Sequence, residues 1–281
     1  MKKTIAFAGS YGANADLACK TFYPQYERLS CSSFSDVFAA VKDGKTEYGI
    51  IPLENSYAGR VSEIHNLLQD SNLFIVAEHF HQIEHHLAGV KGSKISDIKE
   101  IYSHPQALMQ CKNNLSNSKA ALKNYSNTAD AAQLIKDTQD KSKAAICSKL
   151  AAQINNLTIL QENLEDAKKN NMTLWIVLSK NATDPDLIEN KHIITTMLFT
   201  VRNIPGSLYK SLGGFATNNV NMLKLESYIP GGISTQAKFF ISIEGHPNQE
   251  NVRLALEEIG FFSKRIKVLG VYPADSIRFN N

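Results

Sequence analysis

One stretch decides how the rest of the chain is organised: NMTLWIVL, from Asn171 to Leu178. Its β-branched, aromatic and aliphatic residues follow a polar loop, which is typical of a buried strand. A polar stretch from Ser179 to Lys191 comes next, and a second patterned region begins after it. We therefore expect this strand to close a first folding unit, with the linker to a second unit beginning at its far end.

The strand carries one hydroxyl group, that of Thr173, near the point where it begins. We expect this side chain to face a cleft and to take part in chemistry there. The alternative, from periodicity alone, is a threonine that merely suits a pleated, half-buried surface, as threonine often does in strands.

Composition narrows the class of protein. The chain has 281 residues, of which 43% are hydrophobic and 20% charged, and this is long enough for two globular domains. The net charge of +3 is too small to indicate nucleic-acid binding. No window approaches the roughly 20 apolar residues of a membrane span, and the N-terminus leads into a strand instead of a signal peptide. The four cysteines are widely spaced, which favours free thiols in a reducing cytoplasm over disulfides or zinc.

The order of predicted elements separates two regions. Strands and helices alternate over residues 1–178, which indicates an α/β unit. After the polar stretch the order becomes β-α-β-β-α-β, the ferredoxin-like pattern. The expected strands there span 193–201, 221–229, 237–244 and 265–272, and the expected helices span 208–217 and 252–259. We predict two domains, 1–180 and 192–281, joined by a linker over 181–191.

Polar side chains and glycines gather where three predicted strands end. Open α/β sheets bind ligands in the crevice beyond the carboxyl ends of their strands. The three groups are Gly9 with Gly12, then Asn55, Ser56 and Gly59, and finally Ser103, His104 and Gln106. For each group, a capped turn or a structural helix cap is the alternative to a ligand contact.

Four histidines fall within eight residues: His79, His81, His85 and His86. A metal site is one interpretation, but ligands on one strand face require a period of two and further ligands elsewhere. We favour a solvated or edge strand with titratable histidines.

The motifs, taken together and in order, resemble those of the prephenate dehydratase family. They are GSYGAN from Gly9, PLENSYAGRV from Pro52, SHPQALMQC from Ser103 and NMT from Asn171. The C-terminal part resembles the ACT regulatory domain of that enzyme, with PGSL from Pro205 and LESY from Leu225. The resemblance covers nearly the whole chain, which makes it far more specific than any single motif.

The resemblance implies a hydro-lyase that converts prephenate to phenylpyruvate, carbon dioxide and water in L-phenylalanine biosynthesis, without a cofactor. It implies a periplasmic-binding-protein-like catalytic domain of two α/β lobes, with the substrate in the cleft between them. It also implies feedback inhibition by L-phenylalanine through ACT domains that pair across subunits, in a homodimer or homotetramer. An arogenate dehydratase, or a catalytically weak sensor of prephenate or phenylalanine, is the alternative.

The same resemblance assigns roles to residues. Thr173 donates a hydrogen bond to the departing hydroxyl group of the substrate. The substrate is held by Asn55, Ser56, Ser103, His104 and Gln106, with Gly9, Gly12 and Gly59 letting the backbone come close. The chain departs from the family's usual Thr-Arg-Phe pattern at Leu174, and this departure motivates the sensor alternative.

A phenylalanine site is assigned in the ACT domain by the resemblance. One subunit contributes Gly206, Ser207 and Leu208, and the other contributes Asn221, Leu223, Glu226 and Ser227. A helix N-terminus at Gly206 suits a carboxylate, and a glutamate or asparagine side chain suits an ammonium group. A ferredoxin-like dimer that binds no ligand is the alternative.

Overall fold

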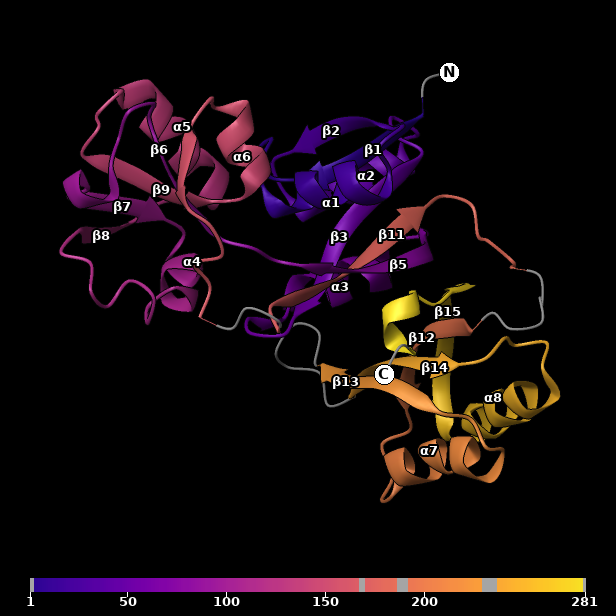
Figure 1. Cartoon of the computed structure of the whole chain (residues 1–281). Coiled ribbons are helices and arrows are strands. Elements are labelled where there is room, and N and C mark those ends of the chain that lie inside the picture. The colour runs from indigo at the N-terminus through magenta and orange to yellow at the C-terminus, as the bar shows by residue number, and fades with distance from the viewer. Residues whose placement is uncertain (1–2, 167–169, 186–191, 229–236, 280–281) are drawn as a thin grey trace. The chain divides into compact units, whose positions relative to one another are not determined.

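The computed structural model describes residues 3–166, 170–185, 192–228 and 237–279. The chain divides into two compact units (Figure 1). The first unit holds residues 1–40, 45–60 and 80–175, and the second holds residues 41–44, 61–79 and 176–281. Part of the predicted linker, residues 186–191, lies outside the described residues. The division at 180 and 192 stays a prediction.

The strand predicted around Asn171–Leu178 is β11, and it lies inside a six-stranded sheet. This sheet has the order β2-β1-β3-β11-β5, with β4 paired to β3. Its strands are β1 (Thr4–Ala8), β2 (Glu27–Cys31), β3 (Tyr48–Asn55), β4 (Gly59–Arg60), β5 (Phe74–Gln82) and β11 (Met172–Ser179). Every residue of β11 from Thr173 to Ser179 is buried, which confirms the buried strand. The helices between these strands are α1 (Asn14–Phe22), α2 (Phe34–Lys42) and α3 (Ser62–Asp70).

A five-stranded sheet completes the first unit, in the order β10-β6-β9-β7-β8. Its strands are β6 (His86–Gly89), β7 (Glu100–Ser103), β8 (Ala121–Asn124), β9 (Lys143–Cys147) and β10 (Thr158–Gln161). The α-helices here are α4 (Pro105–Gln110), α5 (Thr128–Thr138) and α6 (Lys149–Ile154), with a short 3-10 turn over Ile95–Asp97. Strand β7 runs parallel to β8 and β9, and small side chains such as Ala131, Ala132 and Ala151 pack α5 and α6 closely against the sheet.

The described residues from 192 onward include a four-stranded antiparallel sheet, β13-β14-β12-β15. Its strands are β12 (Ile193–Val201), β13 (Met222–Tyr228), β14 (Lys238–Glu244) and β15 (Ser263–Pro273), and its helices are α7 (Ser207–Thr217) and α8 (Glu250–Phe262), followed by a 3-10 turn over Ser276–Arg278. Both helices lie on one face of the sheet (Figure 1), where Phe199, Phe215 and Ile259 share one core. The predicted β-α-β-β-α-β order is confirmed.

Helix α3 and strand β5 belong to the same compact unit as this antiparallel sheet. The ammonium group of Lys267 on β15 donates to the backbone carbonyl groups of Leu68, Gln69 and Ser71, where α3 ends. The last carbonyl groups of a helix have no partner within it, so Lys267 supplies the missing donors. Close packing adds to this contact, because a Cβ atom at Gly270 would lie 2.0 Å from the Ile75 carbonyl oxygen.

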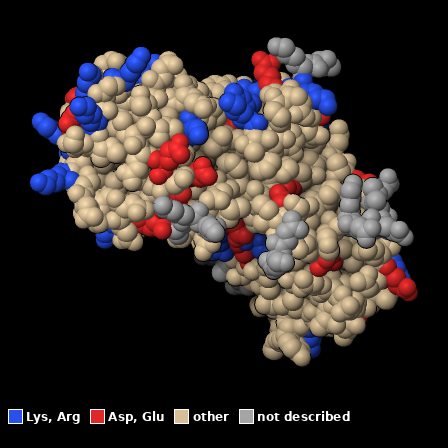
Figure 2. All heavy atoms as spheres, in the orientation of Figure 1, with Lys and Arg blue, Asp and Glu red and all other residues tan. Residues whose placement is uncertain are grey.

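Surface charge agrees with the composition. On the face shown in Figure 2, the lysine and arginine side chains of the described residues lie in several separate groups and form no single basic band. Within the described part of the chain, no helix is long and apolar enough to cross a membrane.

Candidate functional site

A cavity of about 550 Å³ lies in the first unit, between the loop that follows β3, helix α4 and the residues around β11. Its lining residues are mostly polar: Tyr57, Gln106, Met109, Gln110, Asn113, Glu165, Asp166 and Asn171. Its volume is large enough for a small-molecule ligand. Packed apolar side chains do not fill it.

Asn55 organises the wall of this cavity. Its Oδ1 accepts hydrogen bonds from the backbone N–H groups of Tyr57 and Ala58, both at 3.0 Å. Those two donors fix the orientation of the carboxamide, because only the oxygen atom accepts. The Nδ2 atom must then face β11, where it lies 2.9 Å from Asn171 Oδ1 and 2.9 Å from Thr173 Oγ1.

Thr173 lies behind the cavity lining, and only 5% of its surface is exposed. Residues two apart on a strand point to the same face, so Thr173 shares a side of the chain with Asn171, which lines the cavity. Its oxygen accepts from Asn55, which leaves its own hydrogen free to donate. Among the described residues, no group accepts that hydrogen. The Thr173 hydroxyl can therefore donate a hydrogen bond, and it lies just behind the residues that line the cavity.

Gln110 is a cavity residue that the sequence analysis did not select. Its Oε1 accepts a hydrogen bond from Asn171 Nδ2 at 3.2 Å and lies 2.8 Å from His85 Nε2. Within the described chain its Nε2 group has no acceptor, so two N–H donors remain at the cavity. Its spacing of four residues from Gln106 places both side chains on one face of a helix, and this is the signal that would have found it.

Two carboxylates also line the cavity, and backbone donors hold both. Glu165 is 2% exposed, and its Oε2 accepts from the backbone N–H of His85 at 2.9 Å. Asp166 accepts from the N–H groups of Asn113, at 3.1 Å, and Asn114, at 3.0 Å. The described lining contains no lysine or arginine. A ligand carboxylate would therefore be bound by neutral donors.

Ser56 fastens the loop after β3 to the start of β11. Its backbone N–H donates to the Met172 carbonyl at 2.9 Å, and its hydroxyl accepts from the Met172 N–H at 3.0 Å. The same hydroxyl donates to the Asn170 carbonyl. In this arrangement the Ser56 hydroxyl holds two chain segments together.

The residues predicted around the end of β7 lie in different environments. Ser103 is fully buried, and its hydroxyl donates to the Ile146 carbonyl at 2.7 Å, so it joins β7 to β9. His104 is exposed and caps α4, where its Nδ1 accepts from the Gln106 N–H at 3.3 Å. Of the three, only Gln106 lines the cavity.

The predicted glycines serve backbone geometry. All three have positive φ: +102° at Gly9, +90° at Gly12 and +74° at Gly59. A Cβ atom at Gly12 would lie 2.7 Å from Ala151 Cα, so Gly12 allows the loop after β1 to pack on α6. Gly59 has open space around it and is required by its turn conformation alone.

The histidine-rich segment forms no metal cluster within the described residues. His85 and His86 are each 3% exposed, and burial lowers the pKa of His79, His81 and His85. The favoured interpretation, a solvated or edge strand, is confirmed for His79 and His81, which lie on the edge strand β5. It is wrong for His85 and His86, which are buried in the first unit.

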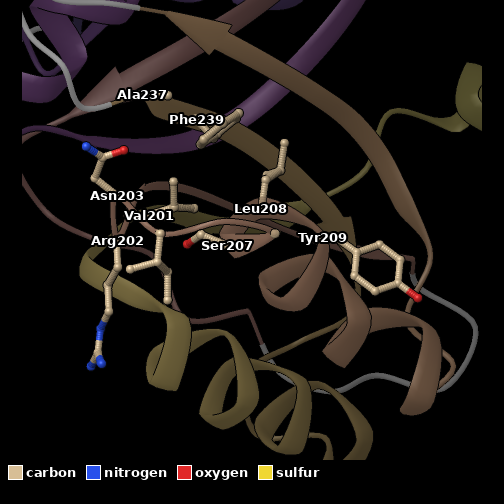
Figure 3. Close-up of a pocket in the computed structure, with 10 residues that line it drawn as sticks. Val201, Arg202, Asn203, Ser207, Leu208, Tyr209, Ala237 and Phe239 are labelled. Carbon is tan, nitrogen blue, oxygen red and sulfur yellow. The ribbon is translucent and has the colours of Figure 1, made fainter.

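A second cavity, of about 310 Å³, lies at the start of α7 in the second unit (Figure 3). Its lining residues are Val201, Arg202, Asn203, Ile204, Gly206, Ser207, Leu208, Tyr209, Ala237 and Phe239. Three of them, Gly206, Ser207 and Leu208, are predicted effector residues. Leu208 points toward Phe239, whereas Tyr209 points outward and is 83% exposed.

The other predicted effector residues line no part of this cavity: Asn221, Leu223, Glu226 and Ser227, on or beside β13. Glu226 lies 2.8 Å from His65 Nε2 and 2.6 Å from Lys224 Nζ. The contact between Glu226 Oε2 and His65 Nε2 lacks good hydrogen-bond angles. Burial raises the pKa of Glu226, but His65 and Lys224 outweigh burial and hold the pKa at about 2. Glu226 is therefore ionised and already paired.

Comparison with known proteins finds relatives along the whole chain. The family model for prephenate dehydratase matches residues 5–183. A bifunctional N-acyl-homoserine lactone acylase/prephenate dehydratase from Komagataeibacter europaeus is 42% identical over 99% of this chain and 98% of its own. A bifunctional chorismate mutase/prephenate dehydratase from Escherichia coli (strain K12) is 30% identical over 97% of this chain and 71% of its own. The solved structure of prephenate dehydratase from Arthrobacter aurescens in complex with L-Phe matches with a TM-score of 0.87 at 25% identity, over 98% of this chain and 91% of its own.

Proposed function

Because the chain belongs to the prephenate dehydratase family, we propose that it converts prephenate to phenylpyruvate, carbon dioxide and water. One observation carries the proposal beyond family membership. The amide network around Asn55 leaves the Thr173 hydroxyl hydrogen and the Gln110 NH₂ group as unused donors in the wall of a polar cavity.

The reaction requires help at one atom above all. The bond between the ring carbon and the hydroxyl oxygen breaks with its electron pair on oxygen, and the departing oxygen takes a proton to become water. The bond to the ring carboxylate breaks at the same time, and its electrons complete the aromatic ring as carbon dioxide leaves. A donor beside the departing oxygen stabilises its growing negative charge.

We assign that donor to Thr173. An alcohol is too weak an acid to transfer its proton fully without help, so the hydroxyl acts by a hydrogen bond to the departing oxygen or by relaying a proton to it. Neutral donors suit the substrate's two carboxylates, because the departing one must stay ionised until it leaves. A cavity that holds the ring with both departing groups aligned contributes further to the rate.

The test is the absorbance of phenylpyruvate in alkali after purified protein is mixed with prephenate. We expect product formation that depends on enzyme concentration. Absence of product at high enzyme concentration would overturn the proposal and favour a sensor. A parallel reaction with arogenate decides between the two substrates, since the motifs do not distinguish them.

For regulation, we propose that L-phenylalanine binds at the start of α7 and lowers activity. The N-terminus of α7 at Gly206 suits its carboxylate, because it carries the positive end of the helix dipole. The predicted residues on β13 would come from a second copy of the chain, in a homodimer or homotetramer. Calorimetry is expected to show phenylalanine binding, and a flat titration would overturn this part.

Reducing surroundings suit the chain, because its four cysteines are unpaired and three of them are buried. We propose a cytoplasmic location on this ground.

One relative gives reason to test a second activity. The Komagataeibacter europaeus protein, at 42% identity over nearly the whole chain, is named for an acylase activity as well. For this chain the corresponding reaction would add water across the amide bond of an N-acyl-homoserine lactone to give a fatty acid and homoserine lactone. Chromatography after incubation detects the free acid, and its absence removes this candidate.

A further inference from the structure

His85 lies between β5 and β6, with its ring buried in the first unit. Its Nε2 atom lies 2.8 Å from Gln110 Oε1. Burial lowers the pKa of His85, and the hydrogen bond with Gln110 opposes burial only in part. The ring is therefore neutral at neutral pH and carries its proton on one of its two nitrogens.

The hydrogen-bond network determines which nitrogen carries that proton. The N–H groups of Tyr57 and Ala58 fix the carboxamide of Asn55, and Asn55 in turn fixes Asn171 by donating to its Oδ1. The Asn171 Nδ2 group must then donate to Gln110 Oε1. Because this oxygen only accepts, His85 must present Nε2–H to it.

The side-chain amide of Gln110 therefore has one fixed orientation. Two donors, from His85 and Asn171, occupy the Gln110 oxygen. Gln110 lines the cavity, and its NH₂ group has no acceptor among the described residues. Two hydrogen bonds to the carbonyl oxygen also polarise the amide, which strengthens its N–H groups as donors.

We propose that His85 is a positioning residue that turns the Gln110 NH₂ group toward the substrate carboxylate that the product retains, that of the pyruvate side chain. This rests on the proposed dehydratase function. A strong donor on the departing carboxylate would stabilise the ground state more than the transition state and slow the loss of carbon dioxide. The retained carboxylate keeps its charge throughout, so a fixed donor binds it without that cost.

A substitution at His85 can separate this role from folding. The backbone N–H of His85 is held independently by Glu165, so the main chain stays anchored when the ring is changed. His85→Phe fills the same space without a donor. His85→Gln restores an N–H group near the position of Nε2. His86→Phe is the matched control, because that ring is equally buried next in the chain and accepts its hydrogen bond from the Asn163 backbone N–H instead of bonding Gln110.

The experiment begins with wild-type turnover of prephenate, whose absence would overturn the proposed function and not this inference alone. In His85→Phe we expect KM to rise about tenfold while kcat changes by less than about threefold, the pattern of a binding interaction lost equally from ground and transition states. His85→Gln recovers most of the loss, and His86→Phe leaves KM within about twofold.

Product inhibition identifies the carboxylate. Phenylpyruvate keeps the pyruvate carboxylate, so its inhibition constant should rise in His85→Phe by the same factor as KM. In a Gln110→Met background, His85→Phe should add nothing further, because the two residues act as one unit. An unchanged KM, a KM effect without an effect on phenylpyruvate, or full additivity with Gln110→Met would each overturn the proposal.

Discussion

The two cavities differ in how completely one chain builds them. The cavity beside α4 is lined by side chains from distant parts of the sequence. A continuous series of hydrogen bonds connects Tyr57 to His85 along this lining. The cavity at the start of α7 is lined by a helix N-terminus, by apolar side chains and by Arg202, Asn203 and Tyr209. The polar side chains predicted to complete it lie on β13, where Glu226 is paired with His65.

The comparison indicates which of the two cavities can bind its ligand with residues of a single chain. The first cavity has Gln110 in its lining and Thr173 just behind it, and each keeps a donor without an acceptor among the described residues. The second has only the half that suits a carboxylate. Under the proposed assignment, the β13 residues that suit the ammonium group come from another copy, so we expect effector binding to depend on assembly in a way that catalysis does not.

Thr173→Ala gives the largest expected effect. The substitution removes the hydroxyl that we propose as donor to the departing oxygen, and we expect kcat to fall by about 100- to 1,000-fold. Thr173→Ser keeps a hydroxyl and should stay within about tenfold of wild type. Steady-state kinetics with a thermal melt of each variant make the test, and near-normal turnover of Thr173→Ala would reject the role.

Asn55→Asp tests the direction of the network. The aspartate still accepts from the Tyr57 and Ala58 N–H groups, but its second oxygen now accepts from Thr173. The Thr173 hydrogen is then used inside the protein, and we expect kcat to fall by about 100-fold without loss of the fold. Unchanged kcat in a variant with a normal melting temperature would show that the orientation of this hydroxyl is irrelevant.

Co-assembly of two variants tests whether the second cavity is shared between copies of the chain. Asn203→Asp places a negative charge in the second cavity, and Glu226→Ala removes the predicted ammonium partner. Each variant should weaken phenylalanine inhibition by about tenfold. When the two variants are co-assembled, a site shared between copies regains one intact pair, so part of the sensitivity returns. A site contained in one chain would regain none.

The smallest effect concerns stability and pH. The pKa of Glu226 in the folded protein, about 2, lies below its ordinary value of 4.5. The pair with His65 and Lys224 therefore stabilises the fold above about pH 4.5, and this contribution is lost as the pH falls toward 2. Denaturant midpoints measured at pH 6 and pH 3 should fall more for wild type than for Glu226→Gln. An equal fall in both proteins would contradict the shift.

Much of the fold was predictable from the sequence because burial leaves a pattern. The run around β11 and the C-terminal order of elements both carried apolar periodicity, and both are confirmed. The strands β2, β4, β8 and β10 were not predicted. Of these, β2, β8 and β10 each lie at an edge of a sheet, and β4 is a two-residue strand paired with β3. Edge strands such as β8, which is exposed throughout, bury too little to show alternation.

The site was predictable in its residue types and less so in its geometry. Asn55, Thr173 and Gln106 were selected, and the structure brings them to the cavity or its wall. Gln110 and His85 were missed as site residues because their importance comes from contacts between distant segments. At Leu174 the departure from the family has a local explanation. The side chain is 2% exposed, and an arginine there would be a buried charge that needs its own partner.

The contacts of Lys267 with α3 and of Gly270 with β5 determine where the chain can be truncated. A cut at the predicted linker would sever a helix in the N-terminal part from the ammonium group that terminates it, and would uncover the Ile75 backbone that Gly270 shields. The N-terminal fragment alone is thus a poor reagent for studying unregulated activity. Point substitutions at Asn203 or Glu226 in the intact chain are the better means of testing the proposed effector response.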